Sequence, residues 1–70
     1  MIRTIIRTRI TTLRQAKGWT KKQLALKADI SVTYIGELEA GKKNPTIVII
    51  EKIANALEVE ISELFKEEII

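Results

Sequence analysis

The sequence predicts an all-α fold, a compact bundle of five short helices. Three observations predict it: apolar residues recur at helical spacing, Ser or Thr stands where several helices would begin, and only a few residues separate the segments. The period-two alternation typical of strands is almost absent. Seventy residues suit one domain with a small core, so we treat residues 1–70 as a single domain.

The first helix is defined by its apolar face. Ile6, Ile10 and Leu13 recur at helical spacing, and Gly18 follows the last residue of the pattern. The spacing therefore predicts a helix over about 6–17.

Capping residues define the next two helices. Thr20, with Gln23 three residues later, forms a capping box that opens one helix. Ser31 is a favoured N-cap for the other, and Gly41 suits the left-handed residue that closes it. Only three residues separate the two helices, so the chain must turn sharply. Residues 20–40 thus follow the plan of a helix-turn-helix, in which the second helix faces a DNA major groove.

Two more helices are predicted beyond Pro45. Thr46 is a favoured N-cap for the fourth, and a short fifth helix covers about 61–66. The buried side of the fourth helix is predicted to hold Ile47, Ile50, Ile53, Ala54 and Leu57.

The apolar run at 47–50 is too dense for one helix face. Four consecutive apolar residues cannot all meet one core at 3.6 residues per turn, so part of the run is expected at the surface. Exposed apolar patches usually mark interfaces. We therefore expect a two-fold homodimer whose interface includes Val48, Ile49, Ile69 and Ile70; the alternative is that Val48 and Ile49 cover the C-terminal tail of the same chain.

Composition excludes several classes of function. The chain has no His, no Cys and one Asp, which leaves no nucleophile paired with a base and no usual metal site, so we expect neither an enzyme nor a cofactor. No apolar run could span a membrane and no secretory signal is present, so a cytoplasmic location is expected. No small-molecule ligand is evident.

Charge is unevenly distributed along the chain. Residues 1–45 hold ten Lys or Arg against three acidic residues, a net charge of +7, whereas residues 46–70 hold two Lys against six Glu, a net charge of −4. A basic half of this kind suggests one surface that faces a polyanion; ordinary solvation of helix surfaces is the alternative.

The chain resembles the small Cro/repressor-type helix-turn-helix family, also called the XRE family, of bacteria and their phages. The resemblance extends from Ile10 to Phe65 and rests on LRQAKGWTKKQLALKADIS, YIGELEAGKKNPT, IEKIANALEV and ISELF, which occur in the family's order and spacing. It implies a lambda-repressor-like domain that binds double-stranded DNA, usually as a dimer, and regulates transcription.

The resemblance also implies roles for individual residues. The early face of the third helix would read bases, which here means Val32, Thr33, Gly36 and Glu37. Contacts to DNA phosphates are expected from Lys21, Lys22, Gln23, Tyr34, Lys42, Lys43 and Asn44, although Tyr34 could equally be packing and Lys21 solvated surface. Arg14 and Glu39 would form a buried ion pair. Asp29 and Glu58 replace frequent glycines, so both are expected at positive φ.

The sequence thus predicts a sequence-specific DNA-binding transcriptional regulator, a repressor that acts as a homodimer on a near-palindromic operator. A controller protein of a restriction–modification system is a variant of this prediction. The alternative from another class is a protein-interaction module, such as an antitoxin or adaptor, which binds its partner through the apolar patch.

Overall fold

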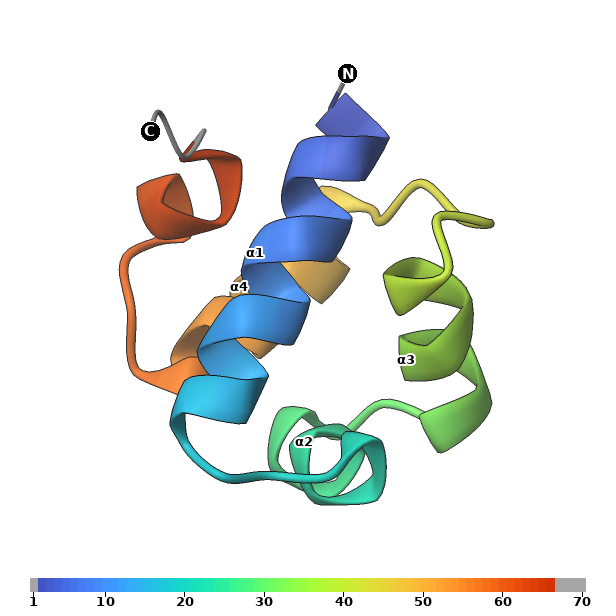
Figure 1. The fold of residues 1–70 in the computed structure, drawn as a ribbon, viewed down its shortest axis with the longest axis vertical. Coiled ribbons are helices and arrows are strands. Elements are labelled where there is room, and N and C mark those ends of the chain that lie inside the picture. Colours follow the sequence, from blue (N-terminus) through green and yellow to red (C-terminus); the bar gives the residue numbers. More distant parts are fainter. Residues whose placement is uncertain (1, 67–70) are drawn as a thin grey trace.

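Four α-helices and one 3₁₀ helix form residues 2–66, the part of the chain that the computed structural model describes, with side chains from residue 4 onward. The elements are α1 (Ile2–Ala16), α2 (Lys21–Ala28), α3 (Val32–Glu39), α4 (Ile47–Leu57) and η1 (Ile61–Phe65). In Figure 1, α1 crosses the middle of the molecule in front of α4, with η1 on one side and α3 on the other. The predicted all-α class is confirmed.

The prediction of five α-helices is wrong, because the last segment is a 3₁₀ helix. It is only five residues long, and Glu60, which precedes it, provides no side-chain cap. Its backbone bond from Glu63 N to the Glu60 carbonyl, 2.9 Å long, spans three residues rather than four. Such tight single turns are common in short connecting segments.

Helix α1 begins at Ile2, four residues before the predicted start. The prediction followed the apolar face, of which Ile6 and Ile10 are buried. A helix can also include residues whose side chains are not packed against the core. Residues 1–17 contain no Gly or Pro that would interrupt the helix. The apolar pattern therefore located the packed part of α1 and not its first turn.

The predicted N-caps of α2, α3 and α4 are confirmed. Thr20 Oγ1 accepts from Gln23 N at 3.1 Å, and the Gln23 side chain accepts from Thr20 N at 2.8 Å, which completes the capping box. Ser31 and Thr46 cap the other two helices in the same way, each through its hydroxyl. Each cap pairs a backbone N–H that the helix itself leaves without a partner.

All four α-helices end in the same backbone arrangement, a Schellman motif. In each, one residue takes the left-handed conformation and two backbone N–H groups turn back to carbonyls of the last turn. The left-handed residues are Gly18, Asp29, Gly41 and Glu58, with φ of 72°, 57°, 75° and 59°. The positive φ expected at Asp29 and Glu58 is confirmed, and it costs roughly 1–2 kcal/mol wherever the residue has a Cβ.

The core lies where α1, α2, α3, α4 and η1 meet, and each element contributes at least one buried apolar residue. These residues are Ile6, Ile10, Leu24, Ala25, Ala28, Ile35, Leu38, Ile50, Ile53, Ala54, Leu57 and Leu64. The prediction that Ile47 is buried is wrong, since 73% of it is exposed. Ile47 is the first residue of α4, and helix side chains lean toward the N-terminus, so it projects beyond the core that begins at Ile50.

Candidate nucleic-acid interface

Helix α3 buries one side and exposes the other. Ile35 and Leu38 are buried, whereas Val32 and Thr33 are exposed and Gly36 and Glu37 are partly exposed. A Cβ placed on Gly36 would meet no atom within 4 Å apart from its own helix and chain neighbours. Nothing in the described part of the chain therefore requires glycine there, although glycine weakens a helix by about 1 kcal/mol relative to alanine.

The start of α2 carries Lys21 and Lys22, both exposed. Within residues 2–66, neither has a hydrogen-bond or ion-pair partner. Gln23 follows them, but its side-chain oxygen is occupied by the backbone N–H of Thr20 in the capping box. Only the amide nitrogen of Gln23 is left to donate to an external acceptor.

The loop after α3 carries Lys42, Lys43 and Asn44, all exposed. The side chains of Lys42 and Asn44 have no polar partner among the described residues. Lys43 differs, because its Nζ lies 3.9 Å from Glu37 Oε1 and 5.6 Å from the centre of the Tyr34 ring. Tyr34 itself is partly buried against the core. Lys43, a candidate phosphate-binding residue, thus forms an ion pair with Glu37, a candidate base-reading residue of the same chain.

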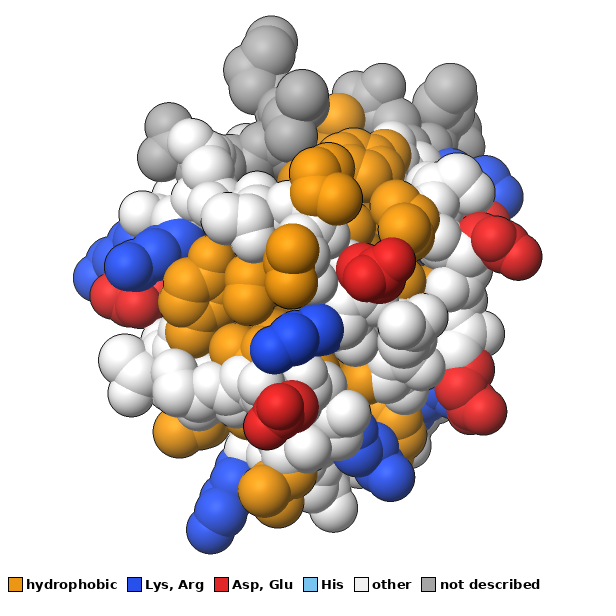
Figure 2. All heavy atoms as spheres, turned by 180° about the vertical axis from the view of Figure 1, so that it is seen from behind, with side chains coloured by type: hydrophobic (Ala, Val, Ile, Leu, Met, Phe, Trp, Pro, Cys, Tyr) orange, Lys and Arg blue, Asp and Glu red, His pale blue; other side chains and the backbone are white. Residues whose placement is uncertain are grey.

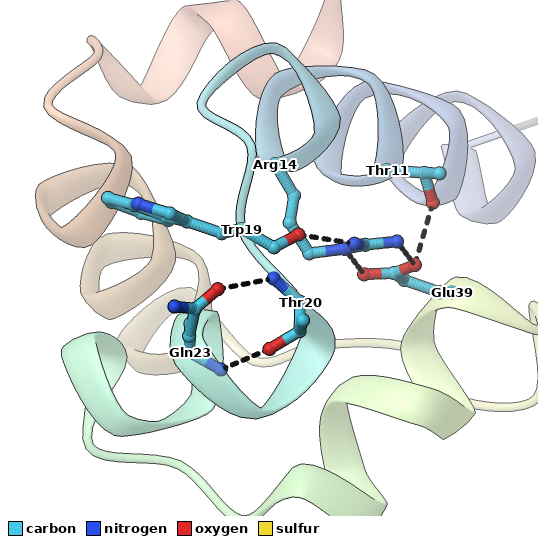
Figure 3. Close-up of polar contacts among 6 residues, drawn as sticks. All are labelled: Thr11, Arg14, Trp19, Thr20, Gln23 and Glu39. Carbon is cyan, nitrogen blue, oxygen red and sulfur yellow. Dashed lines mark hydrogen bonds and ion pairs between the residues drawn. The ribbon is translucent and has the colours of Figure 1, made fainter.

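A buried ion pair joins α1 to the end of α3. Arg14 Nε donates to Glu39 Oε2 at 2.8 Å and Arg14 Nη2 donates to Glu39 Oε1 at 2.9 Å, with 11% and 6% of the two side chains exposed. Figure 3 shows the guanidinium between this carboxylate and the carbonyl of Trp19, which accepts from Arg14 Nη1 at 2.7 Å. Thr11 Oγ1 adds a bond to Glu39 Oε1 at 3.1 Å. The hydrogen bond to Glu39 is the main cause that raises the pKa of Arg14, so the guanidinium remains charged.

The sequence analysis did not predict two contacts near these residues. Glu37 and Lys43 are six residues apart, and only the chain reversal at Gly41 brings them together. Thr11 joins the ion pair from the preceding turn of α1. Knowledge of the Schellman turn at Gly41 would have predicted the first contact, whereas nothing in the spacing identifies the second.

An apolar surface lies on the opposite side of the molecule from the view in Figure 1. Figure 2 shows hydrophobic side chains in two areas of this face, separated by charged and polar groups. Exposed apolar residues of α4 and η1 are Ile47, Val48, Ile61 and Phe65, and Ile49 is partly buried against the core. Val48 is 60% exposed. The predicted interface residues Ile69 and Ile70 lie outside the described residues.

Residues 2–66 contain no helix with the length and hydropathy needed to cross a membrane. Over the same range, His, Cys, Asp and Glu side chains form no group of three that could hold a metal ion.

Comparison with known protein families gives a match to the family described as "Helix-turn-helix", over residues 10–64. These residues include α2, α3 and α4 in full, together with the C-terminal part of α1 from Ile10 onward and all but the last residue of η1. The match therefore covers the candidate interface and the ion pair beneath it.

Curated relatives include regulators and a repressor. The chain is 38% identical over 60 residues to the HTH-type transcriptional regulator SlrR of Bacillus subtilis, which covers 84% of this chain and 40% of SlrR. It is 35% identical to the immunity repressor protein of Bacillus phage phi105, over 86% of this chain and 42% of that protein. The chain thus spans about two fifths of the length of these two relatives.

A solved structure has the same fold over nearly all of its length. The crystal structure of the restriction-modification controller protein C.AhdI from Aeromonas hydrophila superposes with a TM-score of 0.85 at 38% sequence identity. The superposition covers 87% of this chain and 92% of that chain.

Proposed function

We propose, because this chain belongs to the Cro/repressor-type helix-turn-helix family, that it binds double-stranded DNA at specific sequences and regulates transcription. The main support is one observation: along the chain, the exposed residues of α3 lie between two groups of exposed lysines, those that begin α2 and those that follow α3. The immunity repressor among its relatives favours repression. DNA binding of this kind needs no cofactor. A binding site on the chromosome would place the protein in the cytoplasm.

Affinity and selectivity would come from different residues. Lysines that neutralise phosphates release condensed counterions, which supplies affinity without regard to sequence. Lys21, Lys22 and Lys42 suit this role, since their ammonium groups have no partner within residues 2–66. On α3, Val32 and the Thr33 methyl can contact thymine methyl groups, and Glu37 can accept from a cytosine amino group. Gln23, Tyr34 and Asn44 are proposed as further phosphate contacts.

Gly36 offers the first test. Replacing Gly36 with alanine should stabilise the free protein by about 1 kcal/mol, because the helix gains and no neighbour is displaced. The same change should weaken binding to duplex DNA, because a methyl group would hold α3 away from the groove floor. Urea unfolding and binding titrations on the same preparation measure both effects. A variant that gains stability and binds DNA equally well would contradict the placement of α3 in the groove.

Selection of bound duplexes from a random pool tests the function as a whole. We expect a near-palindromic motif from the wild-type chain. Thr33→Ala should change the preferred base at one position of each half-site, since a good base contact discriminates by roughly 1–3 kcal/mol. An unchanged motif would mean that α3 does not read the bases. Failure to enrich any duplex in dilute buffer would refute DNA binding.

We further propose that two copies associate through the apolar surface of α4 and η1. A two-fold dimer would set two α3 helices about 34–36 Å apart, one turn of DNA. Sedimentation should therefore give twice the 8.0 kDa mass of one chain. Val48→Glu should yield monomers with unchanged helix content, because it places a charge in this surface. Leu26→Glu is the matched control: Leu26 is 74% exposed on α2 and should leave the dimer intact. A wild-type monomer at high concentration would refute the dimer.

The same apolar surface favours one second candidate, a protein-interaction module such as an antitoxin or adaptor. Salt distinguishes the two functions. DNA binding should weaken steeply with added salt, at a log–log slope of about −0.9 per phosphate contacted, whereas apolar association should hardly respond. The likeness to C.AhdI also admits a controller protein of a restriction–modification system, a variant of the first proposal.

A further inference from the structure

The contact between Glu37 and Lys43 links a candidate base-reading side chain to a candidate phosphate-binding one. Lys43 Nζ lies 3.9 Å from Glu37 Oε1, and 46% and 39% of the two side chains are exposed. Both groups are therefore accessible to an external partner. Among the four lysines of the proposed interface, Lys21, Lys22, Lys42 and Lys43, only Lys43 has an ion-pair partner within residues 2–66.

The backbone fixes this contact. Gly41 N donates to the Leu38 carbonyl at 3.1 Å and Lys42 N donates to the Glu37 carbonyl at 2.9 Å, the two bonds of a Schellman motif. The left-handed conformation of Gly41 reverses the chain there and returns Lys43 to α3. The ring of Tyr34, 5.6 Å from Nζ, offers the ammonium a second attraction on the same side.

We propose that Glu37 competes with DNA phosphate for Lys43, so that Lys43 binds phosphate only where a base satisfies Glu37. This inference rests on the proposed function. On an unrelated duplex, the carboxylate keeps the ammonium, and one phosphate contact is not made. At a site with a cytosine opposite Glu37, the cytosine amino group donates to the carboxylate and Lys43 is released to the backbone. Specificity then arises partly because Lys43 does not contact phosphate on duplexes that lack this cytosine.

Glu37→Gln is the direct test, measured on a random duplex across a salt series. The amide has the shape of the carboxylate but does not hold Lys43. We expect affinity for random DNA at about 0.1 M salt to rise by up to about eightfold, and the log–log salt slope to steepen by up to about 0.9, because one more phosphate is contacted. Binding to the selected operator should not rise, so the ratio of operator to random affinity falls.

The Lys43→Met background separates this mechanism from simple removal of a charge that phosphate repels. Under the proposal, Glu37→Gln no longer steepens the salt slope when Lys43 is absent. Glu51→Gln on α4 is the control for net charge, since Glu51 is exposed and is not among the proposed DNA contacts. The inference would be overturned if Glu37→Gln changed the salt slope equally in the wild-type and Lys43→Met proteins, or changed it in neither.

A separate variant keeps the proposed function distinguishable from this inference. Lys42→Met removes an ammonium group that has no partner within residues 2–66, so it should lower the salt slope on operator and random duplexes alike. If Lys42→Met lowers the salt slope while Glu37→Gln has no effect on it, the proposed DNA binding is supported and the proposed role of Glu37 is refuted. If the wild-type chain binds no duplex at low salt, the proposed function fails and the inference with it.

Discussion

Glu39→Ala should lower the free energy of unfolding by about 3–5 kcal/mol, the usual cost of removing one partner from a buried ion pair. The change leaves the guanidinium of Arg14 buried, with the Trp19 carbonyl as its remaining acceptor among the described residues. A domain of this size is stabilised by roughly 3–10 kcal/mol in total. The variant should therefore be largely unfolded at room temperature or unfold at much lower urea, as followed by circular dichroism.

A paired replacement tests the cause of this loss. Changing Arg14 to Met and Glu39 to Leu together removes both charges, so the double variant should lose much less stability than the two single changes added. The sign of the pH effect follows from the raised pKa of Arg14: its stabilisation is present below the ordinary pKa and is lost only as the pH rises through the raised value. Raising the pH from about 7 to about 9 should therefore not weaken the pair. A cost below 1 kcal/mol for Glu39→Ala would show that the pair is not a main support of the fold.

Most of the fold could be predicted from local rules. The caps at Thr20, Ser31 and Thr46 are set by side chains within three residues of the bonds that they make. Such signals need no knowledge of the rest of the chain. The left-handed residue at Gly41 was also predicted from its residue type, whereas positive φ at Asp29 and Glu58 was expected from the family resemblance.

The errors arose where the answer depends on distant parts of the chain. Ile47 fits the apolar stripe of α4, yet it is exposed because no other element within residues 2–66 covers it. The final segment was too short for its apolar spacing to distinguish an α-helix from a 3₁₀ helix. The contact of Lys43 with Glu37 required the three-dimensional turn at Gly41, since no helical or strand spacing pairs residues six apart.

Replacing Lys22 and Lys42 together with alanine should weaken binding to every duplex by a similar factor. Both side chains are exposed, and neither has a polar partner within residues 2–66, so their loss leaves the fold unchanged. Two lost phosphate contacts should reduce the steepness of the log–log salt dependence by about 1.8, which amounts to roughly 60-fold in affinity at about 0.1 M salt. Titrations of the selected operator and of a random duplex across a salt series measure both quantities.

The matched control removes two lysines from the acidic half of the chain. Lys52 lies on α4 and Lys66 follows η1, so Lys52→Ala with Lys66→Ala lowers the net charge equally without touching the proposed contacts. If affinity depends only on overall charge, the two double variants will bind alike, and a defined phosphate-binding surface is refuted. If the Lys22 and Lys42 variant alone loses affinity, and loses it equally on operator and random DNA, these lysines position the protein while the residues of α3 choose the sequence.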